Sequence, residues 1–325
     1  MDFYDLYERV CVFEHLEDEN RKHHYLLENG NKLCRFCGKR ENETVFDKSA
    51  HAVSEMVGNK WLFSYRECKS CNTIFGQTYE DSFGKYVLPM KIVSQIFGKK
   101  KTLGYSEAEG QIRINKEMPV LPEFNQDIKA MISVNSGSSI LLPEEDGFML
   151  ELKRKTYVPQ MIYFALLKMA LTIMPTEEFT RYLKSSLSLK YMCDKLGKME
   201  PEKIQEYLGD VRVCGFEEFI PDPERFDGIS VELYRLKKDN EFQRPYMYFC
   251  LNFGNYSLQI PLPTDEQQGK NISTLCCVHN KQSQIKKLKF NKVEEVYSCH
   301  FHADMKEMNE EQKEKLEKCL KMKDK

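Results

Sequence analysis

Four cysteines near the N-terminus are spaced in the way that metal ligands are spaced. Cys34 and Cys37 form one Cys-x-x-Cys pair, and Cys68 and Cys71 form a second pair further along the chain. Two such pairs can present four thiolates at chelating distance, the usual ligand set of a closed, tetrahedral Zn²⁺ site. The alternative is four buried cysteines acting as small apolar side chains, and two matched pairs in one short segment favour zinc. Because a four-thiolate site leaves no open position, we expect this zinc to be structural.

A zinc site does not account for three polar residues in and after the segment between the pairs, namely His51, Asn59 and Asn72. The intervening sequence predicts a β-like run into His51, a loop through Asn59 and a second strand around residues 61–63. After the second pair, the sequence predicts a helix that begins at Cys71 or Asn72. The elements that must position these side chains are therefore a hairpin, a loop and a helix, with the zinc site holding their ends.

The segment from about residue 32 to residue 89 resembles the HNH endonuclease family, also called ββα-metal nucleases. It is most similar to the bacterial branch that has AH-x-x-x-E, GN and E-C-x-x-C-N elements between zinc knuckles. The matching residues are Ala50-His51, Glu55, Gly58-Asn59-Lys60, Glu67-Cys68, Cys71-Asn72 and Phe75-Gly76. Each element alone is weak, but the combined pattern is specific. It covers under a fifth of the chain.

The resemblance implies a role for each of the three polar residues. His51 falls on the family's first His, the general base that activates the attacking water, and the near-neutral pKa of histidine suits that role. Asn59 falls on the middle Asn, which holds the loop and the His ring through backbone hydrogen bonds. Asn72 falls on the third family position, which coordinates a divalent cation, Mg²⁺ or Mn²⁺, that stabilises the phosphate and the leaving oxygen. The implied reaction is hydrolysis of phosphodiester bonds in DNA.

The sequence departs from the family pattern at the position before the first His. Many members carry Asp there as a second metal ligand, whereas this sequence has Ala50. The cation would then be held by Asn72, phosphate oxygens and water, which Mg²⁺ tolerates because it keeps several waters when bound to proteins. Glu55 and Glu80 are further carboxylates nearby, and the pattern assigns neither of them to the metal.

The composition excludes some classes of protein. The chain has 325 residues, 30% of them charged, a net charge of −2, and no apolar run near the about 20 residues that a membrane span needs. The acidic, aromatic start is unlike a signal peptide, so we expect a cytoplasmic protein whose cysteines do not form a disulfide framework.

Local charge is more informative than net charge about nucleic-acid binding. Two stretches, 82–106 and 267–292, contain lysines and no acidic residue. Such runs are usually solvated loops, and they are also what a phosphate-facing surface looks like. We expect Lys99, Lys100 and Lys101, which lie next to the HNH-like segment, to contact DNA.

The rest of the chain predicts a mixture of helices and strands. A largely buried helix is expected over residues 159–174, and a second helix over 176–187 with Thr176 as its N-cap. A charged helix is expected from residue 305 to the end. Strands are expected at 110–115, 138–143, 147–155, 228–236, 244–263 and 271–279.

We therefore predict an α+β protein with two domains. Residues 1–105 form the HNH nuclease domain, a ββα-metal module with zinc knuckles that follows a helical lead-in over residues 1–31. Residues 106–325 form a mixed α+β domain for recognition, dimerisation or regulation. A second copy of the chain or a regulatory ligand is the expected partner of this second domain.

A second group of metal-ligand residue types lies near the C-terminus, and its spacing argues against a site. The group is Cys276, Cys277, His279, Cys299, His300 and His302. Adjacent residues of a strand point to opposite faces, so neighbours such as Cys299 and His300 do not chelate one ion easily. We expect core or surface strand residues here.

Two functions of different classes remain. The first is a metal-dependent endonuclease, which the resemblance associates with restriction or phage defence. The second is a non-catalytic zinc-ribbon module that binds nucleic acid or protein. The missing carboxylate at Ala50 favours the second slightly, and the joint presence of His51, Asn59 and Asn72 favours the first more strongly. The two differ at His51, because catalysis requires it and a binding module can lose it.

Overall fold

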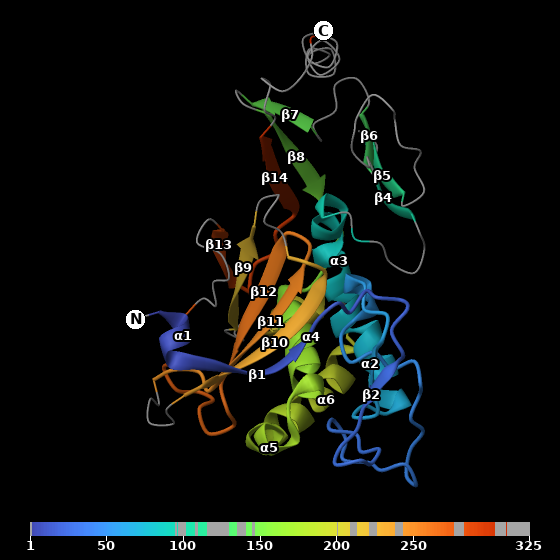
Figure 1. Ribbon diagram of the computed structural model, residues 1–325, viewed down its shortest axis with the longest axis vertical. Helices are drawn as coiled ribbons and strands as arrows, with labels where there is room; N and C mark the ends of the chain where they lie inside the picture. Colours follow the sequence, from blue (N-terminus) through green and yellow to red (C-terminus); the bar gives the residue numbers. More distant parts are fainter. Residues whose placement is uncertain are drawn as a thin grey trace. The chain divides into compact units, whose positions relative to one another are not determined.

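The computed structural model contains both helices and strands, so the predicted α+β class is confirmed (Figure 1). The residues that it describes are 2–94, 96, 102–107, 110–115, 130–134, 141–144, 147–199, 201–208, 213–220, 226–237, 243–275, 283–302 and 310. The chain divides into two compact units, Met1–Tyr86 with Tyr157–Val293, and Val87–Thr156 with Glu294–Lys325. The division of function between residues 1–105 and 106–325 stays a prediction, because these units describe packing only.

The first unit is built on a six-stranded antiparallel sheet. Its strands, in spatial order, are β1 (Tyr7–Phe13), β10 (Ile229–Leu236), β11 (Met247–Phe253), β12 (Tyr256–Leu262), β9 (Cys214–Phe219) and β13 (Gln284–Lys289). The expected strands at 228–236 and 244–263 are confirmed, the latter as the hairpin of β11 and β12. Gly254 makes the turn of this hairpin with a φ of 55°, which glycine adopts without steric cost. Every residue of β11 and β12 is buried.

Helix α4 (Pro159–Ile173) packs against β11 and β12. Its sequence is largely apolar, and almost every residue of it is buried, as expected for a helix in the core. Pro159 stands at its first turn, and Pro175 follows its end, so the predicted helix over 159–174 is confirmed. Figure 1 shows α4 behind the central strands of the sheet.

The helical segment after α4 is interrupted rather than continuous. It consists of α5 (Thr176–Phe179), the 3₁₀ turn η2 (Thr180–Tyr182), α6 (Leu183–Leu196) and α7 (Pro201–Leu208). The prediction of Thr176 as N-cap is wrong, because Pro175 occupies the cap position and Thr176 is the first helical residue. The Thr176 side chain bonds to Glu28 instead of capping the helix.

The predicted helical lead-in over residues 1–31 is also wrong. Over the described residues 2–31, only α1 (Phe3–Leu6) is helical, and the chain continues directly into strand β1. Tyr7 stacks on Phe3, with ring centroids 4.6 Å apart, and meets Tyr248 edge-on at 5.1 Å. Pairing with β10 and burial of these rings outweigh the helical propensity of a charged segment.

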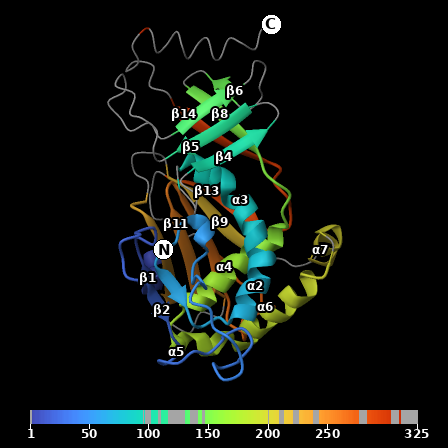
Figure 2. The same cartoon turned by 90° about the vertical axis from the view of Figure 1, so that its right-hand side faces the viewer.

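The HNH-like elements complete the first unit. They are the 3₁₀ turn η1 (Glu55–Val57), β3 (Leu62–Ser64), α2 (Lys69–Gln77) and α3 (Tyr79–Val93), whose last residues belong to the second unit. Strand β2 (His24–Leu26) precedes this segment. β2 and β3 pair in parallel. Figure 2 shows α2 beside α6. The hydroxyl group of Tyr79, the first residue of α3, donates to the carbonyl of Leu189 on α6 at 2.9 Å.

The second unit contains two three-stranded antiparallel sheets. Their strands are β14 (Val296–His302), β8 (Gly147–Lys153) and β7 (Leu141–Glu144), and β4 (Thr102–Glu107), β5 (Gly110–Asn115) and β6 (Ala130–Val134). The strands expected at 110–115 and 147–155 are confirmed, and the one expected at 138–143 is found from Leu141.

Two sequence predictions near the C-terminus have other outcomes. The strand expected at 271–279 is absent over residues 271–275, and the remaining positions, including Cys276, Cys277 and His279, lie outside the described residues. The helix expected from residue 305 also lies outside them, apart from residue 310.

In β14, Cys299 is buried and His300 is exposed, which confirms that the two point to opposite faces. In the described part of the chain, no helix has the length and apolar character needed to cross a membrane.

Candidate active site

The cysteine cluster (Cys34, Cys37, Cys68 and Cys71) has the geometry of a tetrahedral metal site. The four Sγ atoms lie within 4.8 Å of one another. The Sγ atoms of Cys34 and Cys71 are 3.7 Å apart, and those of Cys37 and Cys68 are 3.8 Å apart. A zinc ion with Zn–S bonds of about 2.3 Å requires S–S edges of about 3.8 Å. The donor set and its spacing therefore fit zinc, and all four thiols are free of disulfide bonds.

Local backbone structure brings the four thiols together. Gly38 turns the chain back after the first pair with a φ of 71°, and its N–H donates to the Cys34 carbonyl at 2.8 Å. The second pair lies at the start of α2, where Cys68 is the N-cap and Cys71 lies in the first turn. The helix thus begins at Lys69, slightly before the predicted start.

The segment between the cysteine pairs forms a short hairpin that carries His51. His51 pairs with Phe63 in an antiparallel bridge. The N–H of Ala52 donates to the Leu62 carbonyl at 3.1 Å, and the N–H of Ser64 donates to the Ala50 carbonyl at 2.8 Å. The half-buried His51 ring lies against the Phe63 ring, with centroids 4.6 Å apart.

Asn59 ties the loop of this hairpin together. Its side chain is fully buried, with 0% exposure, and donates to the carbonyls of Val53 at 2.7 Å and Leu62 at 2.8 Å. Its Oδ1 atom accepts from the N–H of Leu62 at 3.0 Å. Asn59 thus gives partners to the Val53 carbonyl and the Leu62 N–H and adds a second bond to the Leu62 carbonyl, which also accepts from Ala52. It therefore fixes the spacing of the two hairpin arms.

Asn72 lies in the first turn of α2, one residue after Cys71, and is half-buried. Its backbone N–H donates to the Cys68 carbonyl at 2.9 Å, while its side chain makes no hydrogen bond to any described residue. The amide oxygen is therefore available to a hard cation such as Mg²⁺, which prefers oxygen ligands. Ala50 is fully buried. Glu80 is not available to a cation in the same way, because its carboxylate is held by Lys168 and Ser54.

Lys168 is a functional candidate that the motif analysis missed. It lies on α4, yet its ammonium group is 2.8 Å from Glu67 Oε2 and 3.0 Å from Glu80 Oε1, and it donates to the His51 carbonyl at 3.4 Å. The side chains of Lys168 and Glu67 are 1% and 0% exposed. The signal in the sequence was a single charged residue within an otherwise apolar helix.

Burial and charge act against each other in this group. Burial alone would lower the pKa of Lys168, but the charges of Glu67 and Glu80 outweigh it and raise that pKa above its usual value. Burial raises the pKa of the Glu67 carboxyl group to about 7, and the neighbouring Lys168 only partly opposes this rise. Lys168 is therefore protonated at neutral pH, and its positive charge contacts Glu67 and Glu80 of the HNH-like segment.

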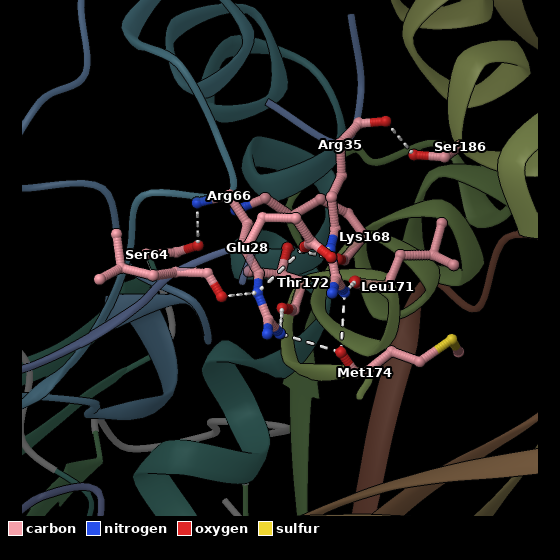
Figure 3. Close-up of polar contacts among 10 residues, drawn as sticks. Glu28, Arg35, Ser64, Arg66, Lys168, Leu171, Thr172, Met174 and Ser186 are labelled. Carbon is pink, nitrogen blue, oxygen red and sulfur yellow. Dashed lines mark hydrogen bonds and ion pairs between the residues drawn. The ribbon is translucent and has the colours of Figure 1, made fainter. Parts of the chain in front are cut away.

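Two arginines next to the cysteine cluster bind the C-terminal end of the same helix (Figure 3). Arg35 donates to the carbonyls of Leu171 at 2.5 Å and Met174 at 2.8 Å, and Arg66 donates to those of Thr172 at 3.1 Å and Met174 at 2.9 Å. These carbonyls have no partner within the helix, and the negative end of the helix dipole favours cations.

Glu28 neutralises part of this positive charge. Its Oε2 atom is 2.6 Å from Arg35 Nε and 3.4 Å from Arg66 Nε. Burial by itself would raise the pKa of Glu28, but hydrogen bonding and charge from Arg35 lower it. Burial lowers the pKa of Arg35 to about 10, so Arg35 stays charged at neutral pH. Figure 3 shows Glu28 between the two arginines.

The predicted DNA contacts Lys99, Lys100 and Lys101 lie outside the described residues. Among described residues, the structure does bring the cysteine cluster together, and it places His51 and Asn59 in one hairpin, with Asn72 on the helix that follows. Their assigned roles stay predictions, because geometry alone does not test them.

Comparison with known proteins supports the resemblance stated above for this part of the chain. Residues 34–88 match the family model described as HNH endonuclease. No curated protein and no solved structure matches the chain. The matched segment starts at Cys34 and ends within α3, so it contains the cysteine cluster, the hairpin and α2. The protein thus carries an HNH endonuclease segment whose cysteine cluster fits a zinc knuckle.

Proposed function

We propose that this protein is a metal-dependent endonuclease that hydrolyses phosphodiester bonds in DNA, with His51 as general base. The observation that carries the proposal is the arrangement of the matched segment, in which a hairpin with His51 leads into a helix with Asn72 beside the cysteine cluster. A zinc-ribbon module that only binds nucleic acid or protein does not require a half-buried histidine at position 51 or an amide side chain at position 72.

In the proposed reaction, His51 takes a proton from water as the water oxygen bonds to phosphorus and the bond to the leaving oxygen breaks. Phe63 and the strand pairing around it hold the His51 ring and main chain. Asn59 keeps the hairpin loop rigid. Asn72 would hold a cation, Mg²⁺ or Mn²⁺, through its amide oxygen. When bound, this cation stabilises negative charge on the phosphate and on the leaving oxygen.

The cysteine cluster has a different task in this proposal. Four thiolates close the coordination sphere of a zinc ion, which leaves no position for substrate. The four cysteines would hold zinc between the turn at Gly38 and the start of α2, which would fix the helix that carries Asn72 relative to the hairpin. Its role is structural.

Further proposals concern partners and biological role. We propose that Lys99, Lys100 and Lys101 contact DNA phosphates, that the protein acts in the cytoplasm, and that it serves in restriction or phage defence. The part of the chain after the HNH segment is proposed to bind a second copy or a regulatory ligand. Protection of bacterial cells from phage infection, lost in His51→Ala, would test the role in defence.

The alternative function is a non-catalytic zinc-ribbon module that binds nucleic acid or protein. It is favoured by Ala50, because the buried methyl group supplies no second ligand for a catalytic cation. The two functions predict different behaviour of His51→Ala, which should leave a binding module intact.

Plasmid cleavage tests the proposal. Supercoiled DNA is incubated with wild type or His51→Ala in Mg²⁺ or Mn²⁺, and nicked and linear products are measured over time. Wild type should cleave, and His51→Ala should be about 10²-fold to 10⁴-fold slower, the usual contribution of a positioned base. His300→Ala is the matched control, since His300 is an exposed histidine of β14, outside the matched segment. DNA binding without cleavage in any metal would favour the alternative, and cleavage by His51→Ala at the wild-type rate would remove His51 from the mechanism.

A further inference from the structure

The three partners of Lys168 come from three different places in the HNH segment. His51 lies on the first arm of the hairpin, Glu67 directly precedes the cluster residue Cys68, and Glu80 lies on α3. A lysine ammonium group has three N–H donors. Lys168 thus places one cation at the point where the hairpin, the cysteine cluster and α3 meet.

A buried ion-pair group such as that of Lys168 contributes little to the stability of the fold. Lysine is almost never fully buried, and its ion pairs must first offset the loss of hydration of the charged group. Apolar residues of similar volume usually stabilise a core as well as a buried ion pair does. Glu67 Oε1 is buried without a hydrogen-bond partner among the described residues, which adds to the cost. Since this ion-pair group adds little stability, we take its role to be holding the neighbouring residues in fixed positions.

The contact between Lys168 and the His51 carbonyl shows which part of the main chain this group holds in place. Strand pairing fixes the residues on either side of His51, through Ala50 and Ala52, but it does not fix the His51 carbonyl. Lys168 donates to that carbonyl from the opposite element, α4. The main chain at His51 is therefore held from two sides, and its ring is held by Phe63.

Helix α4 is itself fixed to the same segment close to Lys168. Arg35 and Arg66 bind carbonyls three to six residues further along the helix, or about one to two turns. The helix thus cannot slide relative to the HNH segment without breaking these bonds.

We propose that Lys168, which lies outside the HNH-matching segment, is a positioning residue of the nuclease site that fixes the main chain at His51 relative to Glu67 and Glu80. This proposal rests on the proposed function, in which His51 is the general base. It extends the nuclease site to α4. An error of about 1 Å in the position of a reacting group can cost about 10²-fold in rate.

The test uses two variants of the full chain. Lys168→Met with Glu67→Gln removes one charge of each sign, and the side chain of Glu80, which is 15% exposed, lets its carboxylate reach water. Lys168→Arg keeps the positive charge and the ion pairs but presents a longer, planar group that cannot approach the His51 carbonyl in the same way. Lys237→Met is the matched control, because Lys237 also donates to a carbonyl, that of Tyr4 at 2.7 Å, but is exposed.

Cleavage kinetics give the first readout. Both variants should keep zinc content and DNA affinity, and kcat should fall about 10-fold to 100-fold with KM unchanged. Lys237→Met should match wild type. A folded, zinc-loaded Lys168 variant with kcat within twofold of wild type would overturn the proposal. Failure of both variants to fold would also overturn it, since Lys168 would then serve the fold and not the position of His51.

The second readout does not depend on cleavage. The ring ¹⁵N–¹H signals of the seven histidines are recorded by NMR, and the His51 signal is identified by its loss in His51→Ala. It should shift in both Lys168 variants and stay unchanged in Lys237→Met. An unchanged His51 signal would contradict the positioning role even if wild type proves inactive. An inactive wild type whose His51 signal does shift in the variants would contradict the proposed function alone.

Discussion

Replacing Asn59 should destabilise the HNH segment more than any other single substitution of an uncharged polar residue in the hairpin. Asn59→Ala removes three hydrogen bonds at once, two donated to the carbonyls of Val53 and Leu62 and one accepted from the N–H of Leu62. Each such bond contributes about 1 kcal/mol net, so the loss is about 3 kcal/mol. The Val53 carbonyl and the Leu62 N–H then stay buried without partners, whereas the Leu62 carbonyl keeps its bond from Ala52, so the expected cost rises to about 4 kcal/mol.

The measurement is urea unfolding at fixed zinc concentration. The control is Asn31→Ala, because Asn31 is exposed and its side chain donates to the nearby carbonyl of Asn29 at 3.0 Å, a bond at the surface. Its free energy of unfolding should change by less than about 0.5 kcal/mol. Asn59→Asp is a second probe, because it keeps the bond from Leu62 N–H but turns an acceptor toward two carbonyls. A loss for Asn59→Ala no larger than that for Asn31→Ala would refute the assignment of Asn59 as the residue that holds the loop.

Four further outcomes are expected. Elemental analysis should find about one zinc per chain, and Cys34→Ser should give unfolded or insoluble protein, because the free energy of zinc binding is folding free energy in such modules; a folded variant without zinc would contradict this. The pKa of Glu28 is lowered by Arg35 in the folded protein, so its carboxylate stabilises the fold fully above the unfolded pKa near 4.5 and less as the pH falls through the folded value. The difference in unfolding free energy between wild type and Glu28→Gln should therefore be largest at neutral pH and shrink below about pH 4.5, and a difference independent of pH would count against the ion pair. Ala50→Asp places a carboxylate at a fully buried position, so it should lower Tm without added metal and gain more Tm from Mg²⁺ than wild type gains; an equal response would show that position 50 does not face the cation. Neutralising Lys99, Lys100 and Lys101 together should weaken DNA binding. The slope of log affinity against log salt concentration should fall by about one unit for each phosphate that these lysines contact in wild type. An unchanged slope would place the DNA path elsewhere.

The sequence by itself determined the features that depend on short separations along the chain. Two cysteine pairs, a hairpin, a loop and a helix all lie within residues 34–88, so local turns and spacing specify their arrangement. The bounds of α4 followed in the same way from Pro159 and Pro175, which set its two ends. The apolar and aromatic residues over 244–263 likewise predicted the strands of the β11–β12 hairpin.

Tertiary structure decided the features that join distant segments. The lead-in over residues 1–31 reads as helical by composition, yet β1 pairs with β10 more than 200 positions later, and only burial against that strand makes the extended form favourable. Lys168 reads as an isolated charge on a buried helix, and its meaning appears only when α4 brings it to Glu67, Glu80 and the His51 carbonyl. The sequence alone indicates that a charge on a buried helix needs a partner of opposite charge. It does not indicate which residue supplies that partner, because no local spacing encodes contacts across 88 to 117 positions. The packing of the helices and the sheet decides this.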